Sequence, residues 1–191
     1  MKQLFLLVFC LVAFSCAPPP AEEVASINED YALASSEYSD LAEKATNHIA
    51  ALDFDAWGEM LADDLEYYFP DGDTDTRTKL IGKQAVLDWY KDWKDKSGIQ
   101  SMTANAANHI PVEAISAPNM TGMPGVYVFS YFSNTMSFEN GETAAVRMHF
   151  AAHFNADKLI DRYYTYYDRT SIINAMEGVN VLNPEAGEGE E

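Results

Sequence analysis

The side chains best suited to acid–base chemistry lie in three segments near the end of the chain, residues 126–138, 143–154 and 159–167. Asp161 and Tyr163 belong to the last segment. A carboxyl group held among aromatic rings can donate or accept a proton, so these two are the candidate catalytic residues. The alternative is that Asp161 reaches water or an arginine and has no chemical role, while the tyrosines form a wall.

The turns between these segments decide which side chains share a face of the sheet. Asn140-Gly141 predicts a two-residue hairpin turn, which sets Phe150 opposite Tyr131. A four-residue turn at 155–158 then sets Phe150 opposite Tyr163. Because strand side chains alternate, this register predicts one apolar face turned toward the helices. With His48 of the first helix added at the cavity mouth, the expected ligand-binding residues are Tyr127, Tyr131, Phe150, Asp161, Tyr163 and His48. A one-residue slip in the second turn would exchange the two faces of the last strand.

The opposite face carries basic and aromatic side chains, among them Arg147, His149, His153, Tyr164 and Tyr166. His149 and His153 lie about 13 Å apart along a strand that rises about 3.3 Å per residue, too far for one zinc ion. We therefore expect no metal site. Exposed aromatic patches of this kind mark interfaces, so this face predicts a homodimer.

Periodicity predicts the elements that position these residues. Apolar residues recur at helical spacing in 39–52, 53–61 and 82–97, and the third helix turns Trp89 and Trp93 inward before it ends at Gly98. A short strand is expected at 65–69 and one long strand at about 100–116, before the three segments already described. Helices first and a meander after them indicate an α+β fold, in which a curved antiparallel sheet wraps around an N-terminal helical layer.

Three motifs resemble the SnoaL-like branch of the nuclear transport factor 2-like superfamily. They are residues 53–65 with Ala62-Asp63-Asp64, then 69–72 with 82–86, and the closing segment 157–168. The resemblance implies a cone-shaped domain at about 36–172, with an apolar cavity and an outer sheet face that often forms a homodimer.

The resemblance also bears on catalysis. An ungapped alignment places the three catalytic positions of the steroid isomerases at Phe69, Ala45 and Phe150. None of these side chains can transfer a proton, so the isomerase mechanism is excluded and binding is favoured.

The first residues have the pattern of an exported lipoprotein. Lys2 precedes an apolar run from Leu4 to Phe14, which is typical of a signal peptide over residues 1–15. Ser15-Cys16 resembles a bacterial lipobox, in which Cys16 is acylated and becomes the N-terminus; the alternative is an ordinary secretory cleavage. Residues 16–35 then form a flexible linker and 173–191 an acidic flexible tail. This predicts an anchored lipoprotein that faces the periplasm or cell surface, with the outer membrane favoured.

Composition limits the partners. The formal charge of −18 argues against nucleic acid, which needs clustered cations, and against adsorption to anionic lipid heads. No cofactor is indicated. We expect a module that binds a small apolar or aromatic molecule in its cone cavity. The alternatives are a cofactor-independent dehydratase, isomerase or hydrolase that uses Asp161 and a tyrosine, or a protein-interaction module.

Overall fold

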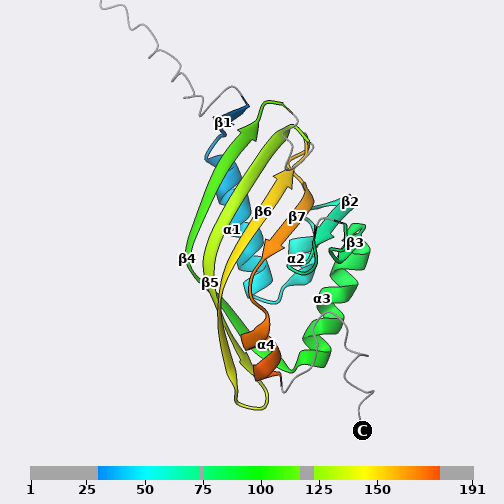
Figure 1. Ribbon diagram of the computed structural model, residues 1–191, viewed down its shortest axis with the longest axis vertical. Coiled ribbons are helices and arrows are strands. Elements are labelled where there is room, and N and C mark those ends of the chain that lie inside the picture. The colour runs from blue at the N-terminus through cyan, green and yellow to red at the C-terminus, as the bar shows by residue number, and fades with distance from the viewer. Residues whose placement is uncertain (1–29, 74, 117–122, 177–191) are drawn as a thin grey trace, which may run out of the picture.

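A curved seven-stranded sheet wraps around helices in the computed structural model (Figure 1). The structure describes residues 30–73, 75–116 and 123–176, so the expected signal peptide, Cys16 and most of the expected acidic tail lie outside the described residues. The strands are β1 (Tyr31–Leu33), β2 (Leu61–Tyr68), β3 (Lys79–Ile81), β4 (Ile99–Ala114), β5 (Gly125–Phe138), β6 (Thr143–Phe154) and β7 (Ile160–Tyr166). The helices are α1 (Glu37–Ala50), α2 (Phe54–Gly58), α3 (Lys83–Ser97) and α4 (Thr170–Ala175).

The sheet has the strand order β1-β4-β5-β6-β7-β2-β3. Its neighbouring strands run antiparallel except β2 and β7, which run parallel, so the sheet is mixed rather than purely antiparallel. No hairpin joins β2 to β7, and their directions are therefore free of the antiparallel constraint that a tight turn imposes.

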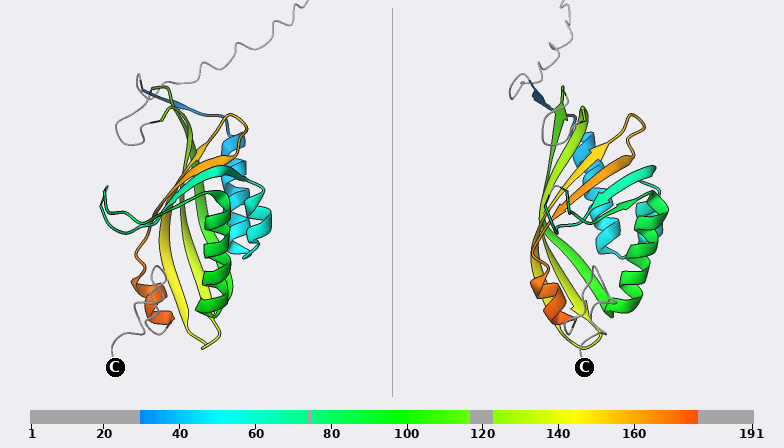
Figure 2. Two further views of the ribbon diagram at one scale, coloured as in Figure 1. Left: turned by 90° about the vertical axis from the view of Figure 1, so that its right-hand side faces the viewer. Right: turned by 45° about the vertical axis from the view of Figure 1, so that its right-hand side comes forward.

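The helices α1, α2 and α3 lie together on one side of the sheet, which we call the inner face (Figure 2). The core between them contains fully buried Trp57, Tyr67, Phe69 and Val86. As predicted, α3 ends at Gly98, which adopts the left-handed conformation with φ 67°. The α+β class and the helical layer expected from periodicity are thus confirmed.

The β5–β6 turn differs from its prediction, with consequences for the site. The Phe138 amide donates to the Glu142 carbonyl at 3.0 Å, and Gly141 has φ 86°. The turn therefore contains three residues, 139–141, the loop in which a left-handed residue completes a bulge. Tyr131 consequently pairs with His149, and Phe150 pairs with Ser130. The expected Tyr131–Phe150 pair is wrong, and Tyr127 and Tyr131 lie on the outer face.

A β-bulge in β7 moves Asp161 from its expected inner position to the outer side of the sheet. Phe154 pairs with Ile160, but His153 pairs with Arg162, so Asp161 is the extra residue of a β-bulge. Because Phe154 pairs with Ile160, the β6–β7 turn contains residues 155–159, one more than expected. This turn and the bulge together shift the register by two residues, which restores the predicted parity for the rest of β7. Tyr163 therefore stays on the inner side, whereas Asp161 meets His153 on the outer side.

Three short elements fall where no regular structure was expected. β1 lies within the segment assigned to the linker and pairs with β4. β3 follows the polar loop and pairs with β2. α4 extends the domain past β7 to residue 175, beside β6. Within the described part of the chain, no helix is long and apolar enough to span a membrane.

Candidate functional site

A small cavity lies between the inner face of the sheet and the helices. Its aromatic walls come from Trp89 and Trp93 on α3, Phe150 on β6, and Tyr167 after β7. Ile172 of α4 completes the wall. The helix α4 itself lies beside the β5–β6 hairpin (Figure 1). The volume of this cavity is about 40 Å³. A dry apolar cavity that takes up benzene encloses about 150 Å³, so a ring-sized ligand requires the walls to move.

The cavity contains no group suited to proton transfer near neutral pH. Among the described residues that line it, none is a carboxylate, histidine, lysine or arginine. Its ionisable groups are the phenols of Tyr90 and Tyr167. Burial raises the pKa of Tyr167 to about 12 and raises that of Tyr90 still further. Both phenols stay protonated at neutral pH and can donate hydrogen bonds but cannot act as bases.

Two other polar side chains reach the cavity wall. The Thr46 hydroxyl donates to the Ala42 carbonyl at 2.8 Å and is satisfied within α1. Asn134 on β5 is 3% exposed, and its amide nitrogen lies 3.9 Å from the Met148 sulfur. Its amide oxygen is buried and has no hydrogen-bond partner among the described residues. Asn134 is therefore the polar group of this wall with unused capacity.

The outer face of the sheet carries a second, wider concavity. We define the outer aromatic face as Tyr127, Phe129, Tyr131, His149, Tyr164 and Tyr166. His149 stacks on Tyr131 with ring centroids 4.3 Å apart and on Tyr166 at 5.5 Å. A groove of about 280 Å³ runs over this face and is bounded at one side by Tyr31. Tyr131 and Tyr166 remain 50% and 48% exposed, so much aromatic surface faces solvent.

Cations hold one end of the outer aromatic face in place. The Arg77 guanidinium lies 4.6 Å from the Tyr166 ring centroid and donates to the Thr165 carbonyl at 2.7 Å. Tyr68 stacks on Tyr164 at 4.7 Å, and its hydroxyl donates to Glu66. That hydrogen bond, opposed by partial burial and aided by Arg162 and Lys79, lowers the pKa of Glu66.

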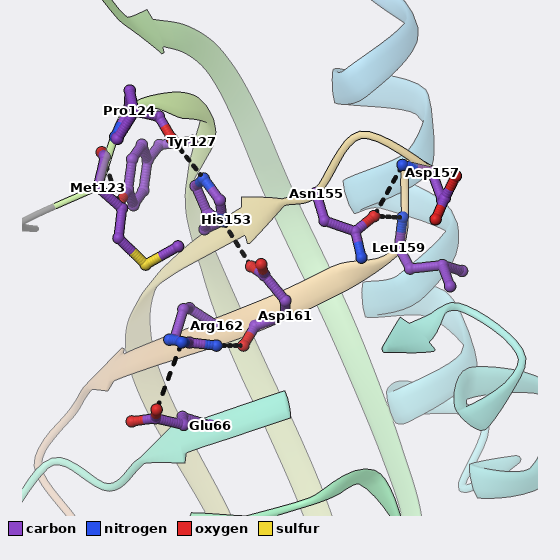
Figure 3. Close-up of polar contacts among 10 residues, drawn as sticks. All are labelled: Glu66, Met123, Pro124, Tyr127, His153, Asn155, Asp157, Leu159, Asp161 and Arg162. Carbon is purple, nitrogen blue, oxygen red and sulfur yellow. Dashed lines mark hydrogen bonds and ion pairs between the residues drawn. The ribbon is translucent and has the colours of Figure 1, made fainter. Parts of the chain in front are cut away.

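His153 and Asp161 form a buried pair at the other end (Figure 3). His153 Nδ1 lies 2.5 Å from Asp161 Oδ1, and its Nε2 lies 3.1 Å from the Pro124 carbonyl oxygen. His153 is 3% exposed and both of its ring nitrogens have oxygen partners, so the pair joins β6, β7 and the residue before β5 rather than forming an open acid–base site.

Several solved structures of bacterial proteins are similar to this chain in fold. A candidate isomerase from Bacillus subtilis is 17% identical, with a TM-score of 0.55, over 75% of this chain and 94% of that chain. A candidate SnoaL-like polyketide cyclase from Shewanella denitrificans is 11% identical, with a TM-score of 0.55, over 75% and 98%. A nuclear transport factor 2-like protein of unknown function from Burkholderia pseudomallei is 14% identical, with a TM-score of 0.56, over 74% and 98%.

The chain has the nuclear transport factor 2-like fold. At these identities the likeness is one of fold. No protein-family model matches the sequence. No curated protein matches it either.

Within this fold the structure separates the predicted site residues. Phe150 lines the cavity, as expected. Tyr163 is buried in the core, where its ring packs near Trp57, and burial raises its pKa far above the ordinary value. His48 is partly buried at the end of α1 and is not part of the wall. Tyr127, Tyr131 and Asp161 lie on the outer side, so the expectation of one shared cavity is wrong.

Asn134 is the cavity residue that sequence reasoning missed. It lies on β5 at the same parity as Phe132 and Met136, which are both buried. A polar amide within an alternating apolar strand is the sequence signal for this residue. The expected two-residue turn, however, places Asn134 and its alternate neighbours on the outer face. The described residues contain no cluster of three or more histidine, cysteine or carboxylate side chains that could hold a metal ion.

Proposed function

We propose that the domain binds a small aromatic molecule in the cone cavity and does not transform it. The observation that carries this proposal is the wall itself, in which aromatic rings surround a polar amide and no base is present. Ligand sites are typically apolar with one or two polar groups that set orientation. The enzyme alternative rests on Asp161, which is bonded to His153 and lies outside the cavity wall.

Ligand entry requires a wider cavity, and α4 is the wall best able to move. This helix has six residues and contributes Ile172 to the cavity. The Asn140 side chain at the hairpin donates to the Ala175 carbonyl at 2.8 Å and ties α4 down. Release of this hydrogen bond, together with outward movement of Ile172 from its buried position, would enlarge the cavity.

Native mass spectrometry of protein purified from its own source tests this function. We expect an additional small-molecule mass on the wild-type chain. Ala104→Phe, which fills the cavity, should abolish it, while Tyr131→Ala on the outer face should leave it unchanged. A chain that carries no small molecule would contradict the proposal. Loss of the added mass in Tyr131→Ala alone would move the site to the outer aromatic face.

We further propose that the protein works as a lipoprotein anchored through Cys16 and as a homodimer through the outer aromatic face. The leader sequence supports the anchor, and the exposed Tyr131 and Tyr166 support the dimer. Cys16→Ser, compared with Ser15→Ala, should release the protein from the membrane fraction. Unchanged membrane attachment of Cys16→Ser would contradict anchoring through this residue.

A further inference from the structure

We propose that Asn134 selects ligands that carry an N–H or O–H donor on an aromatic ring. This inference rests on the proposed binding function and specifies the ligand class for the same cavity. It begins from the one buried amide of the wall, whose oxygen lacks a partner among the described residues.

Burial makes this unpaired oxygen informative. Asn134 is 3% exposed, and leaving a buried acceptor unpaired costs the free energy of its desolvation. An apolar residue of similar size would avoid that cost, as Met136 does at the next inward position of β5. A ligand donor that pairs with the oxygen recovers the lost interaction, which gives the amide a role that packing alone does not.

The surroundings of Asn134 define the rest of the ligand. Phe132, Met136 and Met148 flank the amide, and Trp93 forms part of the same wall. These side chains offer apolar contact and no second acceptor of comparable burial. The Thr46 hydroxyl already donates within α1. The complementary molecule is therefore a flat, uncharged aromatic compound with a donor for Asn134, while the protonated phenols of Tyr90 and Tyr167 can serve an acceptor elsewhere on it. A carboxylate or phosphate would be excluded because no cation among the described lining residues compensates it.

Three probes of nearly equal shape separate the possibilities. Indole carries a ring N–H donor, indene carries neither donor nor acceptor, and benzofuran carries a ring acceptor. Binding is followed by NMR of methionine methyl groups, because Met102, Met136 and Met148 line the cavity. Met60 is buried outside the cavity wall and serves as the reference signal.

Wild-type protein should bind indole about tenfold more tightly than indene, the ratio expected for one buried hydrogen bond. In Asn134→Leu this preference should vanish or reverse. Thr46→Val, which removes a hydroxyl that is already paired, should preserve it. The urea midpoint of Asn134→Leu should equal or exceed that of the wild type, so the lost selectivity cannot be attributed to unfolding.

The outcomes that overturn the inference differ from those that overturn the proposed function. An equal indole-to-indene ratio in the wild type and Asn134→Leu would refute the selector role while the cavity still binds. A preference for benzofuran would refute a donor-bearing ligand. If none of the three probes shifts the cavity methionines relative to Met60, the proposed function fails and the inference fails with it.

Discussion

The two faces of one sheet have opposite chemistry. The inner face lines a cavity of about 40 Å³ that contains Asn134, whose amide oxygen has no partner among the described residues. The outer face presents a groove of about 280 Å³ that is lined mainly by aromatic side chains. On the inner face, polar groups are few and buried. On the outer face, Arg77 and Glu66 hold the tyrosines in place. The difference teaches that strand parity, rather than residue type alone, assigns an aromatic side chain to a core, a cavity or an interface.

The largest expected effect tests that assignment directly. Phe150→Ala removes a buried ring from the cavity wall and should lower the free energy of unfolding by about 3 kcal/mol. Tyr131→Ala removes a ring that is 50% exposed and should change it by less than about 0.5 kcal/mol. Urea unfolding of both variants at high dilution makes the comparison. Similar losses for the two would mean that both rings face the core.

The His153–Asp161 pair should have the next largest effect. Asp161→Leu leaves His153 buried without its partner and should lower the free energy of unfolding by about 3 kcal/mol, because breaking one side of a buried pair leaves an uncompensated polar group. Asp161→Leu combined with His153→Leu should cost clearly less than the sum of the single changes. Urea midpoints of the four proteins complete the cycle. An additive double variant would show that the two side chains do not interact.

A charge introduced on the outer aromatic face should weaken dimerisation rather than the stability of the fold. Tyr166→Glu adds a charge to each copy at the proposed interface and should weaken dimerisation by on the order of tenfold. Thr135→Glu places the same charge on an exposed position of β5 outside the groove and serves as the control. Analytical ultracentrifugation measures both. A wild-type protein that stays monomeric at tens of micromolar would contradict the dimer itself.

The smallest effect concerns pH. Burial lowers the pKa of His149 and of His109 below the ordinary value of 6.5. The unfolded chain therefore binds more protons near that pH, and stability is complete above about 6.5 and falls as pH drops through the lowered values. His149→Phe should weaken this dependence between about pH 7 and about pH 5, where carboxylates remain ionised. Urea midpoints across that range check it, and an unchanged slope would exclude His149.

Much of the fold followed from local pattern, because helix and strand signals act over few residues. Gly98 predicts the end of α3, and the alternation of side chains in 143–154 predicts both ends of β6. The parallel pairing of β2 with β7 could not be predicted, since no turn joins them.

The site was harder to predict because it depended on turn length. Asn140-Gly141 predicts a two-residue turn, whereas the turn has three residues, and this difference of one residue places Tyr127 and Tyr131 on the other face. Phe150 was placed correctly because its neighbours on β7 were displaced by two residues, which preserves parity. The Asp161 bulge has no sequence signal that we recognise, so the His153 contact could not be foreseen.

Strand β1 should be the first element of the domain to detach under mechanical force. A pull on Asp30 toward the N-terminus loads β1, whose contacts include three residue pairs with β4, the Ile115–Asp30 backbone hydrogen bond of 2.8 Å and the Ser116–Asp30 side-chain hydrogen bond of 2.8 Å. So short a clamp should peel before the core yields, releasing about 3.3 Å of chain per residue. Because Tyr31 bounds the groove on the outer aromatic face, peeling would open that groove at one side while the cavity stays closed. Tension on the N-terminal segment would thus widen the outer groove.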